Sequence, residues 1–390
     1  MKKLLILIFI LVSFSASMAQ DTTKKPSPYE IKNPSISVVI HPSDKKDNAG
    51  INFATQFRGV TTLPDSAVDK REKHLKNIRQ LTFEGENAEA YFSPDEKHLS
   101  FQARGKGEGV CDQIYTMTLD GKNVKRISTG FGRTTCSYYY PSGDKILYSS
   151  THEMYDRKCP PEPDRSKGYV WPIYKGYDIY IADTNGTLIS RLTQDSLYYD
   201  AEATISPYGD RIVLTSTRSG GVDLYTCNLN GTEPKRLTKE EGYNGGAYFS
   251  PDGTKIVYRA SHPKGEELKE FKELLKQGLI RPTSLDIMIM DSSGSNKKQV
   301  TDNGKANFCP YFFSNGQRII FSSNMDDPKG REFDLYAIDT DGKNLERITY
   351  KEGFDGFPMF TKDGKHLVWC SNRNGSHAHN TNIFLADWVD

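Results

Sequence analysis

The sequence predicts an all-β protein, a six-bladed β-propeller of four-stranded antiparallel blades in which an N-terminal strand closes the last blade. Three observations predict this class. An apolar residue followed by Thr or Ser ends six consecutive segments at intervals of 45 to 65 residues, and the shorter intervals match a four-stranded blade. Each segment holds short alternating strands separated by turn residues. Aromatic residues make up 11% of the chain, while long apolar helical stripes are nearly absent.

The first 19 residues have the pattern of a cleavable signal peptide, with two lysines, an apolar run at 4–12 and the small-residue site Ser17-Met18-Ala19. That apolar run is too short for a membrane-spanning helix, which needs roughly 20 residues. We therefore expect an exported protein that begins near Gln20 and is not membrane-embedded, in the periplasm or, as the alternative, secreted. The net charge is +1, so no nucleic-acid partner is expected.

Residues 20–75 form a polar leader, and residues 76–390 form the predicted propeller. The repeating unit is clearest from Arg236 to Ser261, where Arg-Leu-Thr precedes a polar loop, an Ala-Tyr-Phe strand, a Ser-Pro-Asp-Gly turn and an alternating strand. Pro and Asp-Gly between two apolar runs predict a tight hairpin, because proline presets one φ and glycine accepts a positive one. The six closing pairs are Leu81-Thr82, Ile127-Ser128, Leu192-Thr193, Leu237-Thr238, Val300-Thr301 and Ile348-Thr349.

The last segment lacks a fourth strand. It ends after a third strand that runs from Asn382 to Trp388, whereas the stretch from Lys76 to Thr82 reads as a fourth strand with no three strands before it. Pairing these two segments would close the ring and remove the open edges that invite aggregation. We therefore expect the N-terminal strand to complete the sixth blade.

The turn sequence Tyr-Phe-Ser-Pro-Asp-Gly at 248–253, the Asp-Leu-Tyr third strand at 223–225 and the Arg-Leu-Thr ending resemble the blades of the TolB family, also called WD40-like or PD40 repeats. The resemblance covers about residues 76–388 and implies the same fold. TolB works in the Tol–Pal system of the cell envelope, where its propeller binds a peptidoglycan-associated lipoprotein. The resemblance therefore implies an envelope protein or peptide as the partner. TolB also carries an α/β domain before its propeller, and the leader here is short for such a domain.

Polar residues recur where the innermost strand of each blade begins, near the mouth of the central channel. They are Asn87, Asp200, Asn244, Asn307 and Asp355, with Glu89 and Glu202 two residues further on in blades one and three. This set is a candidate site for a ligand, a cation or a partner peptide. The Asn and Asp side chains also fit local hydrogen bonding to the strand backbone, and both interpretations stay open.

Two insertions between the second and third strands form the second candidate surface. The first, from His152 to Tyr177, is rich in proline and aromatic residues, and the second, from His262 to Leu285, contains a predicted helix at 266–278. They flank the short loop of blade three and predict a cleft between two walls. The alternative is that they fold onto the rim to bury their own apolar residues. The candidate binding residues are His152, Tyr169, Trp171, Tyr174, Arg218, His262 and Phe271.

Export makes disulfides possible for the six cysteines. Cys227 and Cys370 fall inside strands and are expected to be core residues. Cys111, Cys136 and Cys159 fall near loops, and we expect one disulfide among these three. The favoured pair is Cys111 with Cys136, because strands fix both positions.

The sequence contains no Gly-x-Ser-x-Gly elbow, no Cys-x-x-Cys pair, no His-Glu-x-x-His motif and no phosphate-binding loop. We therefore predict a non-catalytic binding or scaffold module without a cofactor or a metal. The alternative is a propeller enzyme, or an accessory subunit, that acts on a peptide or glycan at the channel mouth. In that case Glu89, Glu202, His152 and His262 are the candidate acid/base groups.

Overall fold

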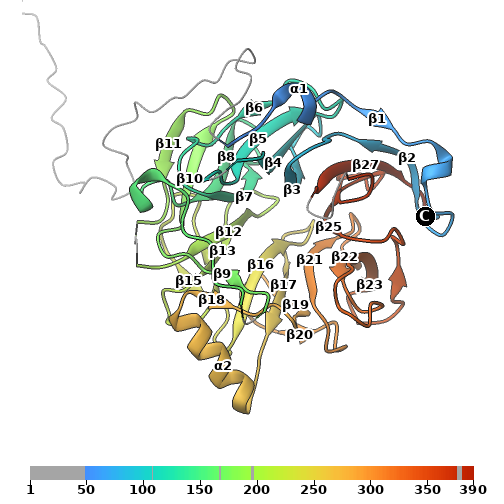
Figure 1. Ribbon diagram of the computed structural model, residues 1–390. Coiled ribbons are helices and arrows are strands. Elements are labelled where there is room, and N and C mark those ends of the chain that lie inside the picture. Colours follow the sequence, from blue (N-terminus) through green and yellow to red (C-terminus); the bar gives the residue numbers. More distant parts are fainter. Residues whose placement is uncertain (1–48, 108, 167, 195–196, 376–379) are drawn as a thin grey trace, which may run out of the picture.

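A computed structural model describes residues 49–390 except 108, 167, 195–196 and 376–379, so the predicted signal peptide lies outside the described residues. Six antiparallel sheets are arranged around a common axis as the blades of a propeller (Figure 1). The predicted fold class is confirmed. Blades one to five each run from an innermost strand outward in chain order, as the alternating apolar pattern and the turn residues predict.

The strands of blades one to three have the following bounds. They are β3 (Glu86–Phe92), β4 (His98–Arg104), β5 (Gln113–Thr118) and β6 (Lys125–Arg126); β7 (Thr134–Tyr139), β8 (Lys145–Ser150), β10 (Asp178–Asp183) and β11 (Leu188–Arg191); and β12 (Asp200–Ile205), β13 (Ile212–Ser216), β14 (Asp223–Cys227) and β15 (Lys235–Arg236).

The strands of blades four to six follow the same order. They are β16 (Tyr243–Phe249), β17 (Lys255–Ser261), β19 (Asp286–Asp291) and β20 (Lys298–Gln299); β21 (Asn307–Phe312), β22 (Arg318–Ser323), β23 (Asp334–Asp339) and β24 (Glu346–Arg347); and β25 (Asp355–Phe360), β26 (His366–Ser371) and β27 (Asn382–Trp388).

The sixth blade is completed by the N-terminal strand β2 (Leu75–Gln80), which pairs antiparallel with β27. The register runs from Leu75 opposite Trp388 to Gln80 opposite Phe384. A short strand, β1 (Thr61–Thr62), adds to the outer edge of β2. The structure thus confirms the predicted closure, and it joins the two ends of the propeller through backbone hydrogen bonds (Figure 1).

The repeated Arg-Leu-Thr ending has a structural cause, which blade three shows. The Asp223 carboxylate accepts hydrogen bonds from Thr238 Oγ1 at 2.9 Å and from Arg236 Nη2 at 2.8 Å. Thr238 Oγ1 also accepts the Leu224 N–H at 2.9 Å. The fourth strand is only two residues long in this blade, so these side-chain bonds hold it where the ladder is short. Asp178 and Asp334 repeat the arrangement with their own Arg and Thr.

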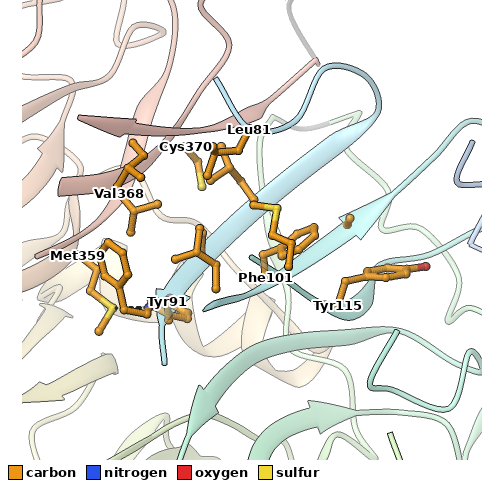
Figure 2. Close-up of a cluster of buried hydrophobic side chains, with 14 of the residues drawn as sticks. Leu81, Tyr91, Phe101, Tyr115, Met359, Val368 and Cys370 are labelled. Carbon is orange, nitrogen blue, oxygen red and sulfur yellow. Dashed lines mark hydrogen bonds between the residues drawn. The ribbon is translucent and has the colours of Figure 1, made fainter. Parts of the chain in front are cut away.

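Hydrophobic clusters fill the space between neighbouring blades. The cluster between blades six and one contains Leu81, Val368 and Cys370 on one side and Phe101 and Tyr115 on the other (Figure 2). The described part of the leader belongs to this core, because the short helix α1 (Phe53–Gln56) packs Phe53 and the adjacent Phe57 against it. Burying such aromatic side chains is the main favourable term in a fold made of short strands.

The leader is also attached to blade six by buried charges. Glu72, which follows the 3₁₀ turn η1 (Asp65–Ala67), accepts hydrogen bonds at 3.1 Å from both terminal nitrogens of Arg373. Arg373 Nη2 also donates to both oxygens of Asp355 at 3.1 to 3.2 Å. One guanidinium therefore satisfies two buried carboxylates from segments far apart in the chain.

Candidate functional site

The two insertions meet each other above blade three. Strand β9 (Trp171–Pro172) of the first insertion pairs antiparallel with β18 (Leu279–Ile280) of the second, with Trp171 opposite Ile280 (Figure 1). The prediction of two separate walls with an open cleft between them is therefore wrong, because backbone hydrogen bonding joins the walls. We call residues 169–174 and 279–283 the roof.

The second insertion contains the predicted helix, α2 (Gly265–Lys276), which precedes β18. Its Phe271 and Leu275 pack with Trp171 and Tyr174 against a buried cluster around Ile173 and Ile280. The two insertions therefore bury part of their own apolar surface, which is what the alternative interpretation expected.

A disulfide attaches the first insertion, which also contains the 3₁₀ turn η2 (Tyr155–Arg157), to blade one. Cys111 is bonded to Cys159, with Cα atoms 5.8 Å apart. The prediction of one disulfide among the three loop cysteines is confirmed, but the favoured partner, Cys136, is wrong. Cys136 is a free thiol because the backbone of its strand turns its side chain toward the channel.

Beneath the roof lies a cavity of about 1180 Å³, which we call the chamber. The roof contributes Trp171 and Tyr174, and the innermost strands contribute Glu89 and Glu202. Its walls are largely aromatic. The aromatic lining residues are Tyr91, Tyr169, Trp171, Tyr174, Tyr177, Tyr199, Tyr243, Tyr248, Phe308, Phe333, Phe354 and Phe357.

A β-bulge in each innermost strand places one residue at the channel. The register between the first and second strands shifts at the same place in all six blades. At that place the backbone has a φ between 51° and 60°, which is uncommon outside glycine. The six residues are Glu89, Cys136, Glu202, Gly246, Cys309 and Phe357. All six line the chamber.

Gly246 makes room for a buried ion pair. A Cβ at this position would overlap Nη1 of Arg259, so the glycine leaves the space that the guanidinium occupies. Arg259 pairs with Glu202 and also donates to the hydroxyl of Tyr243. Glu202 further accepts bonds from Thr215 Oγ1 at 2.7 Å and from the Gly246 N–H at 3.0 Å. The charge of Glu202 is therefore fully compensated within the protein.

Glu89 has a different environment. Its carboxyl is in no ion pair of the described residues, and the Cys136 thiol is its hydrogen-bond partner. Burial raises the pKa of the Glu89 carboxyl to about 7, and the nearby Glu202 and Asp112 carboxylates act in the same direction. Burial also raises the pKa of the Cys136 thiol well above its usual value. Both groups are therefore neutral in mildly acidic solution.

Tyrosines close the channel below this level. Two residues beyond the bulge, the Tyr248 hydroxyl of blade four donates to the Tyr91 hydroxyl of blade one at 2.6 Å. Tyr138 of blade two is hydrogen-bonded to Tyr311 of blade five. Each pair joins opposite blades of the six-bladed propeller. The centroids of neighbouring tyrosine rings lie 5.5 to 6.3 Å apart. The chamber is therefore a dead end with its opening on the roof side.

Comparison with known proteins agrees with this architecture. A family model described as the TolB beta propeller domain, PD40, matches residues 163–280. Over these residues the chain is similar to the blades of that family. An uncharacterized protein of Agrobacterium fabrum (strain C58 / ATCC 33970) is 24% identical over 235 residues, which are 60% of this chain and 64% of that relative.

Two solved structures share the TolB-type fold. A protein assigned as TolB from Agrobacterium tumefaciens superposes with a TM-score of 0.51 at 19% identity, over 79% of this chain and 92% of its own. TolB from Acinetobacter baumannii superposes with a TM-score of 0.50 at 17% identity, over 78% of this chain and 65% of its own. The matched region is thus just under two thirds of the Agrobacterium fabrum relative and of the Acinetobacter TolB.

The predicted mouth residues of the propeller divide into two groups. Glu89 and Glu202 line the chamber. The Asn and Asp side chains are buried and already bonded within the protein, the Asn side chains partly to the preceding blade. Asn87 donates to the Glu84 carbonyl, Asn244 to the Val222 carbonyl and Asn307 to the Leu285 carbonyl. Asp200 pairs with Arg218, and Asp355 pairs with Arg373.

The predicted loop residues also separate in space. Trp171 and Tyr174 line the chamber and Tyr169 stands at its edge, 59% exposed. His152 is buried against Tyr180 and bonded to Ser150, and burial lowers its pKa to about 3. His262 is hydrogen-bonded to Asn244. Neither histidine lines the chamber.

Sequence reasoning missed much of the aromatic wall. Tyr199, Tyr243 and Phe354 each lie one residue before a predicted mouth position, and Phe333 precedes the first residue of a third strand. Parallel bridges pair Tyr177 with Tyr199 and Phe333 with Phe354, which places their side chains along the chamber. Aromatic residues immediately before the recurring Asn, Asp positions were the available signal.

Two findings concern the described residues as a whole. No helix in 49–390, apart from the stated gaps, is long and apolar enough to cross a membrane. Within the same residues, no group of three or more His, Cys, Asp or Glu side chains is placed to hold a metal ion.

Proposed function

We propose that this protein is an exported, periplasmic binding module whose chamber receives a peptide segment of a cell-envelope partner, without catalysing a reaction on it. The observation that carries the proposal is the roofed, closed-ended, aromatic-lined chamber of about 1180 Å³. This volume lies above the roughly 300–1000 Å³ of most small-molecule pockets, which favours a peptide segment as the occupant.

The lining supports recognition of a protein segment. Trp171, Tyr174 and Phe308 present rigid aromatic surfaces at low cost in side-chain entropy, and such residues dominate the energetics of protein interfaces. Trp171 is held over the Arg259 guanidinium at 5.2 Å from the ring centroid. The roof is therefore preorganised rather than an open loop, which lowers the entropic cost of binding.

The four acid/base groups that an enzyme would use do not lie together in the chamber. Of its four acid/base candidates, His152 and His262 are bonded within the blades away from the chamber, and Glu202 is neutralised by Arg259. Glu89 alone faces the chamber without a charged partner. A single carboxyl without a second acid/base group or a nucleophile favours binding over turnover.

The test is capture of envelope proteins by roof variants. A photo-crosslinker is placed at Thr283 in cells that export the protein, and the yield of the crosslinked partner is measured. Trp171→Ala should reduce this yield at least tenfold. Tyr208→Ala is the matched control, because Tyr208 is 73% exposed in the turn between β12 and β13, on the opposite face. Equal loss in both variants, or loss in the control alone, would contradict the proposal. The melting temperature of each variant shows whether the propeller is intact.

A further inference from the structure

The charged groups that line the chamber are paired unequally. Glu86 is bonded to Arg104 at 2.7 Å, Glu202 to Arg259, and Asp112 lies 3.9 Å from Arg133. Glu89 has no cationic partner in the part of the chain that the structure describes. An unpaired carboxylate away from water is unfavourable, and a cation brought to it by a ligand would recover that free energy.

Glu89 lies at the inner end of the chamber. It belongs to the ring of bulged residues, directly above the tyrosine floor where Tyr91 meets Tyr248. The groups around it are the Cys136 and Cys309 thiols, the Glu202 and Asp112 carboxylates and Arg259. Because Arg259 is engaged by Glu202, the inner end carries one uncompensated acidic group.

The outer edge carries the opposite charge. Lys305, Lys329 and Arg331 line the chamber from two loops of blade five, and none of the three side chains is in an ion pair among the described residues. The Asp327 carboxylate of the same loop accepts the backbone N–H groups of Lys329 and Arg331. Lys329 and Arg331 are exposed, and Lys305 is partly buried. A ligand that complements the chamber is therefore positive at its inner end and negative where it passes blade five.

The closed floor restricts the geometry of such a ligand. The hydroxyl bond between Tyr91 and Tyr248 crosses the axis, so a chain cannot pass through the channel and must end at the floor. From these observations, and building on the proposed function, we infer that the chamber binds a peptide by its free N-terminal amine. The amine pairs with the Glu89 carboxylate, and acidic residues that follow it pair with Lys305, Lys329 and Arg331.

Three peptide amides test this inference by calorimetry on the full exported chain. They are Phe-Gly-Glu-Glu with a free N-terminus, the same peptide N-acetylated, and Phe-Gly-Lys-Lys with a free N-terminus. The free acidic peptide should bind at least tenfold more tightly than either of the others. Glu89→Gln should reduce the preference for the free amine to less than threefold. Glu346→Gln should leave it unchanged, because Glu346 pairs with Lys73 and does not line the chamber.

The pH profile identifies the amine. Affinity requires an ionised Glu89, whose pKa is about 7, and a protonated α-amine, whose pKa is about 7.8. The affinity should therefore peak near pH 7.4 and fall about sixfold by pH 6 and about ninefold by pH 9. If a lysine side chain of the peptide paired with Glu89 instead of the α-amine, the affinity would stay constant up to about pH 10.

Several results would overturn the inference. Equal affinity of the free and acetylated peptides, a plateau above pH 8, tighter binding of the lysine peptide, or binding of none of the three would each do so. The proposed function would still stand if Trp171→Ala abolished capture of the envelope partner. If the free acidic peptide bound as predicted while capture was unaffected by Trp171→Ala, the proposed function would fail and the amine site would remain.

Discussion

Removal of the Arg373 side chain should destabilise the propeller more than removal of any partly exposed arginine. The side chains of Arg373, Glu72 and Asp355 are 4%, 0% and 0% exposed. In Arg373→Ala two buried carboxylates lose their cation, and breaking such a buried pair costs about 3–5 kcal/mol. Arg373 also covers the Trp369 ring at 5.2 Å, so the loss includes packing.

This free energy converts into a melting shift through the entropy of unfolding. An entropy of about 2.1 cal/mol/K per residue over roughly 340 residues gives about 0.7 kcal/mol/K, so the midpoint should fall by about 4–7 °C. Scanning calorimetry at pH 7 measures the shift. Arg104→Ala is the control, because its pair with Glu86 is partly exposed and should contribute about 0.2–1 kcal/mol.

A neutral triple variant separates lost charge from lost packing. Glu72→Gln, Asp355→Asn and Arg373→Met together remove all three charges, and most of the stability should return, because a buried ion pair is close to neutral relative to an uncharged replacement. If Arg373→Ala lowers the midpoint no more than Arg104→Ala, the network does not attach the leader to blade six as described.

Two further predictions concern the disulfide and Glu89. Cys111→Ser with Cys159→Ser should lower the free energy of unfolding by up to about 4 kcal/mol, because the bridge closes a loop of 48 residues. Urea denaturation measures this change. A loss below about 1 kcal/mol would show that the disulfide does not stabilise the fold by closing this loop. Folded Glu89 keeps its proton to about pH 7, against 4.5 for an ordinary Glu, so its contribution to the free energy of unfolding falls as pH rises between these values. The stability of the wild type relative to Glu89→Gln should therefore be higher at pH 5 than at pH 7.5, and an equal difference at both pH values would refute the buried position of the carboxyl.

The blades could be predicted from the sequence because their determinants are local. The turn from Ser250 to Gly253 and the alternation of the strand after it fix a hairpin within a few residues. Closure could also be predicted, since an unmatched third strand at Asn382 and an unmatched fourth strand near Lys76 have one sterically sensible partner each. Both inferences depend on pairing rules rather than on side-chain detail.

The roof and the disulfide depend on contacts that the sequence does not encode locally. The pairing of Trp171 with Ile280 joins two-residue strands far apart in the chain, and no periodicity marks strands so short. The β-bulge explains why Cys136 is not in the disulfide. The alternation of side chains along a regular strand does not turn Cys136 into the channel, whereas the bulge, with a φ of 54° at Cys136, does. The same shift separates Glu89, which faces the chamber, from Asn87, whose amide is bonded to the Glu84 and Thr381 carbonyls.

The cross-channel tyrosine bonds also determine how the molecule can deform. A propeller ring could admit a bulky guest by widening, with all blades moving outward together. Here two hydrogen bonds join opposite blades across the channel, one between Tyr91 and Tyr248 and one between Tyr138 and Tyr311. Widening of the ring would have to break both. The lower part of the channel is therefore stiff. Ligands of different size must therefore be accommodated at the roof. There, the two residue pairs between β9 and β18 would have to separate.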